Sequence, residues 1–284
     1  MFDLAAYLER IGLSGRPSLA EVHFAHSVAI PFENLDPRAG RPVSLAIEDL
    51  QNKLVYEGRG GYCFEQNLLL GAALEALGYE VELFLARARK GAAPGTIRPR
   101  SHLLLRVQAD GQSWHADVGY GLGTPFEPLP FGAGAEHEQL GWSFRIVEEH
   151  PELVLQAEDD GEWVDLYGFL PHPVPPIDVE TINWWVSTHP RSPFVTGLMV
   201  GAQSREGTRV SLRDDHDAGG LALRERVPGR STVMPVDWAA VPELLATNFG
   251  IEGFFLDGDA RLRQVSPARQ RSPLNSGSDA GARS

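Results

Sequence analysis

The chain has 284 residues, of which 43% are hydrophobic and 22% are charged, proportions typical of a soluble globular protein. Its 38 acidic residues outnumber 25 lysines and arginines and give a formal net charge of −13. Such a surface repels nucleic-acid phosphates and anionic lipids, so neither partner is expected, although a local basic patch for an anionic cosubstrate is compatible with it. The single cysteine excludes an internal disulfide and a cysteine-rich metal framework.

The two ends of the sequence predict a cytoplasmic protein with a disordered tail. Asp3, Glu9 and Arg10 interrupt the place where a signal peptide needs an apolar segment, so the first residues predict an amphipathic helix. No run of about 18 apolar residues occurs, and a transmembrane helix is therefore not expected. Residues 266–284 lack the apolar side chains of a core and predict the tail.

Helical periodicity dominates residues 1–80, the first of three predicted units. Ser18 and Glu21 stand in capping-box spacing at the start of one helix. Another helix begins just after Gly60 and Gly61 and ends at Gly78, since glycine after an apolar periodic run is a common helix stop.

The hydrophobic period changes in the next unit, residues 81–185, where alternating patterns predict strands. Asp110 and Gly111 lie between two such stretches and strongly favour a two-residue hairpin turn. Residues 186–265 mix helical and strand patterns and form the third predicted unit.

Cys63 is the first residue with recognisable chemistry. It opens a predicted helix, whose N-terminal partial positive charge favours a thiolate over a thiol. The glycines just before it let the backbone approach closely and leave N–H groups to face a reacting carbonyl. A buried structural cysteine is the alternative, but the Gly-Gly and helix-start context favours a nucleophile.

Hairpin geometry selects a base for this thiol from the nine histidines. A two-residue turn pairs Ala109 with Gln112, and this register places His102 and Asp117 on one face as diagonal neighbours, with Cα atoms about 7–8 Å apart. Asp117 would hold the imidazole in one tautomer while His102 takes the thiol proton. Two unrelated polar residues on a solvated face are the alternative.

Two other arrangements compete with this pair. His115 shares the same strand face, but its predicted cross-strand partner is Arg106 and it lies nearer to the turn. A Cys/His/His zinc site would need a ligand pair at close spacing, which the sequence lacks, so no metal is expected.

The sequence around these residues resembles the arylamine N-acetyltransferase family. RGGYCFEQN around Cys63 is similar to the family's nucleophile motif, while RSHLLLRV with His102 and DVGYG from Asp117 resemble its histidine and aspartate motifs, in the family's order. IPFENLD, STHPRSPFVTGLMV and NFGI are also similar to family segments, so the resemblance runs from Ile30 to Ile251.

The resemblance implies an α+β fold with the triad core of cysteine proteases and transglutaminases. Residues 1–80 would form a helical bundle carrying Cys63, residues 81–185 a central β-barrel carrying His102 and Asp117, and residues 186–265 an α/β lid. It also implies acetyl-CoA as cosubstrate, no bound cofactor, and an aromatic amine or hydrazine as acceptor in a ping-pong reaction through acetyl-cysteine. The resemblance assigns no residue of this sequence to CoA binding, because the family's CoA contacts do not lie in one motif.

The resemblance further implies that Phe32, Tyr120 and Phe194 line the acceptor pocket, although core packing is an alternative for the two phenylalanines. The family more often has phenylalanine at the middle position, so Tyr120 adds a hydroxyl to the pocket wall. A hydroxyl without a hydrogen-bond partner would favour acceptors that carry a polar group. A hydroxyl that is bonded to the backbone would not affect which acceptor is preferred.

Three other functions remain open at the level of sequence. A macrolactam-forming amide synthase would keep the fold and triad but use a carrier-bound chain. A cysteine protease or transglutaminase would act on peptidyl acyl groups. A non-enzymatic binding module would tolerate loss of the thiol.

Overall fold

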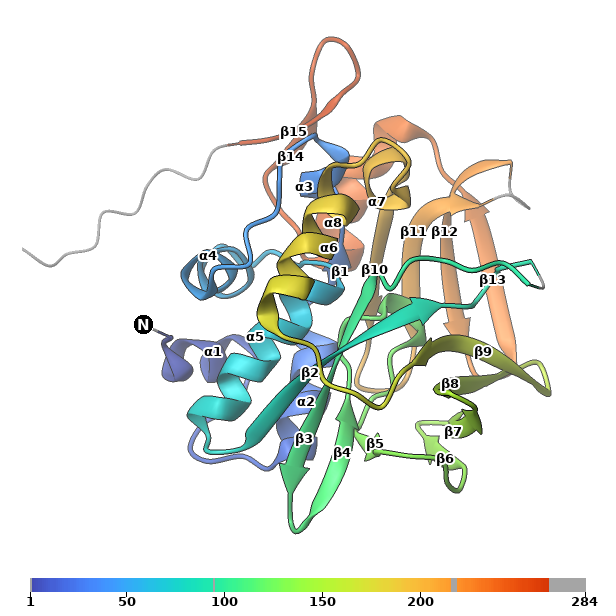
Figure 1. Cartoon of the computed structure of the whole chain (residues 1–284). Coiled ribbons are helices and arrows are strands. Elements are labelled where there is room, and N and C mark those ends of the chain that lie inside the picture. The colour runs from blue at the N-terminus through green and yellow to red at the C-terminus, as the bar shows by residue number, and fades with distance from the viewer. Residues whose placement is uncertain (1, 94, 216–218, 266–284) are drawn as a thin grey trace, which may run out of the picture.

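A group of N-terminal helices supports the helix that begins at the cysteine. The computed structural model describes residues 2–93, 95–215 and 219–265 (Figure 1). The helices of the first part are α1 (Leu4–Arg10), α2 (Leu19–Ala29), α3 (Leu35–Arg38), α4 (Ile47–Gln51), the π-helical turn η1 (Asn52–Tyr56) and α5 (Cys63–Ala76). Leu8, Val22 and Leu70 are among the buried side chains that join α1, α2 and α5 into one core.

The predicted helix boundaries in this part are confirmed. Ser18 accepts the Glu21 N–H while the Glu21 carboxylate accepts the Ser18 N–H at 2.8 Å, so the capping box is present at α2. Helix α5 begins at Cys63 itself, and Gly78, at φ 95°, follows its end. The left-handed conformation at Gly78 is one that glycine adopts without steric cost.

An antiparallel eight-stranded sheet forms a nearly closed barrel beside the helices. Its strand order is β5-β4-β3-β2-β9-β8-β7-β6. The Gln139 side chain, at the end of β6, connects this end strand to the segment just before β5, because its oxygen accepts the Phe126 and Glu127 N–H groups at 2.8 and 3.0 Å. The barrel strands are β2 (Glu80–Ala88), β3 (His102–Ala109), β4 (Gln112–Ala116), β5 (Leu129–Pro130), β6 (His137–Gln139), β7 (Trp142–Glu149), β8 (Glu152–Asp159) and β9 (Glu162–Phe169).

A second sheet, here called the C-terminal sheet, packs against one end of the barrel. Its order is β1-β10-β11-β12-β13, comprising β1 (Phe32–Glu33), β10 (Met199–Gln203), β11 (Arg209–Asp215), β12 (Gly220–Val227) and β13 (Arg230–Pro235). Helix α8 (Val241–Phe249) covers one face, where Leu212 and Leu245 are buried. In Figure 1 this sheet lies above the barrel, and α1, α4 and α5 lie to the left of both.

The edge strand β1 comes from the N-terminal part of the chain and ties it to the C-terminal sheet. Phe32 pairs with Gly201 of β10 and also forms a parallel bridge with Gly61, just before the cysteine. The remaining elements are the 3-10 turns η2 (Gly121–Gly123) and η3 (Trp238–Ala240), the helices α6 (Pro176–Thr188) and α7 (Pro193–Thr196), and the hairpin strands β14 (Phe254–Leu256) and β15 (Leu262–Gln264).

The architecture is α+β with a barrel, as predicted. None of the described helices has both the length and the apolar character needed to cross a lipid bilayer. The predicted tail, residues 266–284, lies outside the described residues.

Candidate active site

Close backbone packing fixes Cys63 at the first position of α5. The side chain is 2% exposed, and its Sγ lies 3.6 Å from the Ser101 carbonyl oxygen. A Cβ at Gly60 would lie 2.0 Å from the Pro31 oxygen, and a Cβ at Gly119 would lie 2.7 Å from the Cys63 Cα. These two glycines therefore allow the segment before the helix and the turn after β4 to approach the cysteine.

The predicted hairpin register is confirmed, and it brings His102 beside Asp117. Ala109 pairs with Gln112, and β4 ends at Ala116, one residue before the aspartate. His102 Nε2 lies 2.7 Å from Asp117 Oδ2, and both side chains are buried. This contact leaves Nδ1 as the ring nitrogen that is not bound to the carboxylate.

Electrostatics favour a charged imidazole between the carboxylate and the thiol. Burial opposes the charge on His102, but the Asp117 carboxylate and, next, hydrogen bonding with Cys63 raise the pKa of His102 to about 10. Burial likewise opposes the charge on Asp117, yet the attraction of His102 holds the pKa of Asp117 well below its usual range. The pair is therefore an imidazolium and a carboxylate across the neutral pH range.

The Asp117 carboxylate is held by three further donors. Asn67 Nδ2 and the Gly119 N–H donate to Oδ1 at 2.9 and 2.8 Å, and the Tyr167 hydroxyl donates to Oδ2 at 2.7 Å. Sequence reasoning missed Asn67 and Tyr167. Asn67 lies one helical turn after Cys63 on α5, a spacing that could have indicated it, whereas Tyr167 on β9 carries no local signal.

His115, the competing base, lies on the other side of Tyr167. It pairs with Arg106 as predicted, and its Nε2 is 2.8 Å from the Tyr167 hydroxyl oxygen. Burial lowers the pKa of His115 to about 4, so the ring is neutral at physiological pH. Because Tyr167 already donates to the carboxylate, the neutral His115 donates to Tyr167.

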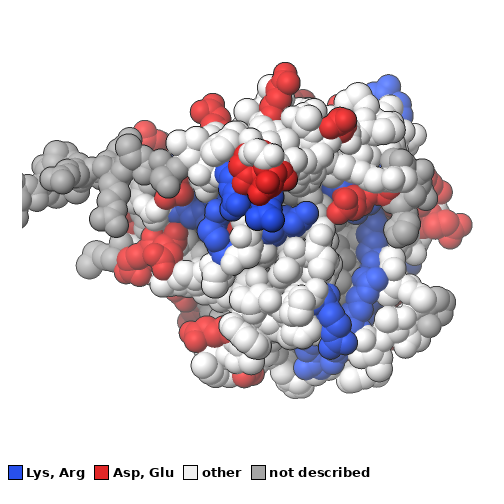
Figure 2. Space-filling model, turned by 90° about the horizontal axis from the view of Figure 1, so that it is seen from above, with Lys and Arg blue, Asp and Glu red and all other residues white. Residues whose placement is uncertain are grey.

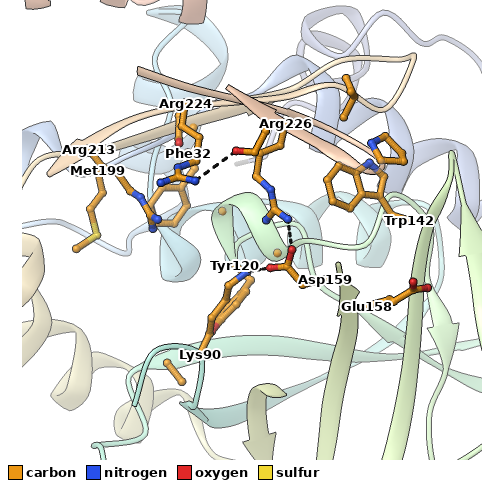
Figure 3. Close-up of a pocket in the computed structure, with 18 of the residues that line it drawn as sticks. Phe32, Lys90, Tyr120, Trp142, Glu158, Asp159, Met199, Arg213, Arg224 and Arg226 are labelled. Atoms are coloured by element: carbon orange, nitrogen blue, oxygen red, sulfur yellow. Dashed lines mark hydrogen bonds and ion pairs between the residues drawn. The ribbon is translucent and has the colours of Figure 1, made fainter. Parts of the chain in front are cut away.

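The three predicted pocket aromatics line one cavity together with Cys63 and His102. Its volume is about 860 Å³, and Figure 3 shows part of its wall. The Phe32 and Phe194 ring centroids are 6.3 Å apart, and the Tyr120 ring stands edge-on to His102 at 5.0 Å. The Tyr120 hydroxyl donates to the Leu166 carbonyl at 2.5 Å, so its partner is the backbone.

Five charged side chains, three of them buried and two partly buried, form a cluster behind the segment that leads into α5. Glu33, Asp36 and Glu65 supply the carboxylates, and Lys53 and Arg59 the cations. Arg59 binds Glu33 at 2.6 Å, while Lys53 binds Asp36 and Glu65, each at 2.7 Å. The cluster links β1, α3, η1 and the start of α5, and sequence reasoning did not identify it.

Within the described part of the chain, no group of three histidine, cysteine or acidic side chains has the arrangement of a metal site. The fold instead brings together a cysteine sulfur, an imidazolium and a carboxylate in sequence, at one end of an aromatic-lined cavity. Such an arrangement is suited to nucleophilic acyl transfer.

Comparisons with known proteins agree with this chemistry. A family model described as N-acetyltransferase matches residues 17–252. The arylamine N-acetyltransferase of Mycolicibacterium smegmatis is 40% identical over 279 residues, covering 93% of this chain and 98% of the relative. The arylamine N-acetyltransferase of Mycobacterium tuberculosis (strain ATCC 25618 / H37Rv) is 39% identical over 259 residues, covering 88% of this chain and 89% of the relative.

Solved structures give the same result. The arylamine N-acetyltransferase from M. tuberculosis superposes with a TM-score of 0.82 at 38% identity, covering 88% of this chain and 94% of that one. The structure of the Mycobacterium marinum arylamine N-acetyltransferase in complex with CoA superposes with a TM-score of 0.81 at 36% identity, covering 88% of this chain and 93% of that one. The fold and the sequence together define an acetyltransferase. The chain belongs to the arylamine N-acetyltransferase family, as its motifs predicted.

Proposed function

We propose that this protein transfers the acetyl group of acetyl-CoA to arylamines and arylhydrazines through an acetyl-Cys63 intermediate. The observation that carries the proposal is the contact sequence from Cys63 through His102 to Asp117 at the end of an aromatic-lined cavity. Family membership supports acetyl-CoA as donor and an arylamine as acceptor. A cytoplasmic location fits a reaction that consumes acetyl-CoA and needs a reduced thiol.

In the first half-reaction, the Cys63 thiolate attacks the carbonyl carbon of the acetyl thioester. The carbon–sulfur bond to CoA then breaks, and the departing thiolate takes the proton carried by the His102 imidazolium. First-turn N–H groups of α5 have no partner within their own helix, so they are suited to stabilise the oxyanion of the tetrahedral intermediate.

In the second half-reaction, the amine nitrogen attacks the acetyl carbonyl of acetyl-Cys63. His102 accepts the proton from that nitrogen, and the Cys63 thiolate leaves, which restores the starting ion pair. Asp117 acts as a positioning residue, because its bond to Nε2 keeps Nδ1 directed to the reacting atoms. Phe32, Tyr120 and Phe194 provide ring faces for an aromatic acceptor.

The proposal is tested by measuring the mass of the intact protein after incubation with acetyl-CoA. We expect a gain of one acetyl group on the wild type, no gain on Cys63→Ala, and loss of the gain when an arylamine is added. A wild-type protein that never gains the acetyl group would contradict the proposal. Acylation only by a carrier-bound or peptidyl donor would instead identify an amide synthase or a transglutaminase-like enzyme.

A further inference from the structure

Two histidines of α2 lie in the interior of the molecule, in contrast to most of the described lysines and arginines. Figure 2 shows that lysines and arginines gather in a few groups on a face where acidic residues are scattered. Arg213, Arg224 and Arg226 line the cavity from β11 and β12 of the C-terminal sheet (Figure 3). His23 and His26, by comparison, are both 0% exposed. They lie three residues apart, on one face of the helix, and the proposed reaction uses neither.

His23 joins two backbone segments that lie outside the strand pairing of the barrel. Its Nε2 accepts the Asp117 N–H at 3.1 Å, and its Nδ1 lies 3.0 Å from the Phe126 carbonyl oxygen. Both distances are those of hydrogen bonds. The pairing of β3 with β4 ends at Ala116, and β5 begins only at Leu129, so the ladder supplies no partner for either backbone group.

These two partners fix which nitrogen of the His23 ring carries the hydrogen. A backbone N–H can only donate and a carbonyl can only accept, so Nε2 is unprotonated and Nδ1 is protonated. The ionisable groups around the ring are Asp117 on the hairpin, His26 on the same helix and His115 on β4. Burial outweighs the attraction of the Asp117 carboxylate and lowers the pKa of His23 to about 4, which agrees with a neutral ring.

The two bonds of this ring close the base of a loop, residues 117–126, that contributes to the cavity wall. Tyr120 of this loop is one of the aromatic residues that line the cavity. The next N–H along the loop, that of Val118, is accepted at 3.0 Å by Asn67 Oδ1 on α5. Two helices, α2 and α5, therefore hold two successive N–H groups at the point where Asp117 leaves the hairpin.

His26 makes the corresponding connection to the cysteine side of the site. Its Nε2 lies 2.7 Å from Gln66 Oε1, and Gln66 Nε2 donates to the Pro31 and Gly61 carbonyls at 2.8 and 3.2 Å. Because the amide nitrogen is used on these carbonyls, the amide oxygen accepts from His26 Nε2, and Nδ1 accepts the Tyr7 hydroxyl at 2.9 Å. The two histidines of α2 are therefore opposite neutral tautomers.

We infer that His23 is a positioning residue for the triad: as the neutral Nδ1–H tautomer, it holds the Asp117 N–H and so keeps the carboxylate in place beside His102. Its consequence for acetyl transfer rests on the proposed function. A buried N–H without a partner is costly, so Asp117 moves when the acceptor is removed, and the ion pair with His102 weakens. His23 itself contacts no reacting atom and acts through Asp117.

Asparagine and glutamine at position 23 separate the two bonds of the ring. The asparagine amide reaches the place of Nδ1, so His23→Asn keeps the bond to Phe126 and loses the bond to Asp117. The glutamine amide reaches the place of Nε2, so His23→Gln keeps the bond to Asp117. We expect His23→Asn to lower kcat/KM for acetyl transfer about tenfold and His23→Gln to remain within about threefold of wild type. Equal losses in the two variants would overturn the inference.

The pH profile of Cys63 alkylation is a readout that a merely structural role would not move. We expect the rate of His23→Asn to rise between about pH 6 and 8, because a displaced Asp117 no longer keeps His102 charged, whereas His23→Gln keeps a level profile. Val22→Ala is the matched control, since it removes buried packing from the same helix without a hydrogen bond to the hairpin. It should lower the melting temperature and leave the profile level. A His23→Asn profile as level as that of Val22→Ala would contradict the positioning role.

NMR of the imidazole nitrogens tests the tautomer in the wild type, without any substitution. Their chemical shifts distinguish the two neutral tautomers from the cation. We expect one histidine to remain the Nδ1–H tautomer between about pH 5 and 8, while His26 and His115 remain Nε2–H tautomers and His102 remains charged. A wild type that lacks a non-titrating Nδ1–H histidine overturns the inference, even where a variant at position 23 fails to fold.

The outcomes separate this inference from the proposed function, because alkylation and NMR require no acetyl-CoA. A wild type that is acetylated by acetyl-CoA, but whose alkylation profile is unchanged by His23→Asn, overturns the positioning role alone. A wild type that never gains an acetyl group, but whose alkylation profile depends on residue 23 as expected, overturns the proposed function and supports the positioning role.

Discussion

The imidazole of His102 lies between a carboxylate from the hairpin and a thiol from the first turn of α5. Its raised pKa means that folding favours the protonated ring. The stabilisation that this contributes is fully present below the unfolded value of about 6.5 and is lost as the pH rises through about 10. The charge on the ring is therefore constant across the pH range in which the enzyme would work.

This constancy predicts how Cys63 reacts with iodoacetamide. The alkylation rate should stay nearly level between about pH 6 and 8, because an imidazolium that keeps its charge over this range favours the thiolate form of the sulfur beside it. His102→Gln should react slowly and gain rate with pH, as an ordinary thiol does. Mass spectrometry of the alkylated peptide gives the rate, with N-acetylcysteine as the reference. A wild-type rate that rises with pH in parallel with this reference would contradict the assignment.

Tyr120 is the residue at which the structure decides between two interpretations of the sequence. Its hydroxyl donates to the Leu166 carbonyl, so the pocket presents a ring and not a hydroxyl that needs a partner. Tyr120→Phe should therefore change kcat/KM equally for a hydroxyl-substituted and an alkyl-substituted aniline. Parallel assays of the two acceptors measure this ratio. A specificity shift of about tenfold toward the alkyl acceptor would show that the hydroxyl contacts the substrate.

Local rules predicted part of this residue-level arrangement and missed the rest. A two-residue turn fixes the register of its strands, so counting from Asp110 and Gly111 was sufficient to place His102 near Asp117. The Tyr167 hydroxyl reaches the same carboxylate from a strand 50 residues further along the chain. That contact depends on how β9 pairs with β2 when the barrel forms, which no local pattern reports.

At the level of elements, the segment between β1 and α5 positions the nucleophile. Gly61 bridges Phe32, Glu65 accepts the Tyr62 N–H at 3.0 Å, and Arg59 is paired with Glu33. The sequence predicted the start of α5 correctly, because the glycines and the apolar period are local. It could not predict the five-residue charge cluster, since its members come from β1, α3, η1, α5 and the segment before α5.

This packing predicts a strong effect of a single methyl group at Gly60. Gly60→Ala places a Cβ 2.0 Å from the Pro31 oxygen, so β1 and the cysteine segment must separate. We expect a loss of about 1–3 kcal/mol in the free energy of unfolding and slower alkylation of Cys63. Gly134→Ala is the control, because its Cβ meets open space, and it should change stability by less than about 0.5 kcal/mol. Equal effects of the two substitutions in urea unfolding would contradict this account.

On the scale of the whole molecule, the C-terminal sheet is joined to the rest of the chain at both of its ends. Asn34 donates to the Phe194 and Gly197 carbonyls, each at 2.8 Å, and accepts the Met199 N–H at 2.7 Å. At the barrel, the buried Arg209 guanidinium stacks 4.3 Å from the Trp142 ring centroid. The sequence motifs placed the sheet in the correct family architecture, but not these junctions, which join residues far apart in the chain.

The shared edge strand predicts that the first two predicted units do not fold without the third. A chain ending at residue 185 would lose β10, leaving the backbone of β1 unpaired beside the cysteine segment. We expect it to lose cooperative unfolding and the level alkylation profile of Cys63, as measured by urea titration and mass spectrometry. A chain ending at residue 265 retains every described element and is the control. Cooperative unfolding of the shorter chain with an intact alkylation profile would contradict the expectation.

The arginines on the cavity face of the C-terminal sheet belong to a molecule with a net charge of −13, and this contrast has a kinetic consequence. A polyanionic donor is repelled by the whole molecule at long range and attracted by the arginines only after entering the cavity. At about 0.1 M salt the screening length is ~10 Å, so added salt weakens the distant repulsion first. Stopped-flow association of CoA should therefore become faster as salt is raised from low concentration, while dissociation also accelerates. Diffusional encounter with this acidic molecule is thus slowest in dilute buffer, the reverse of the electrostatic steering seen between oppositely charged partners.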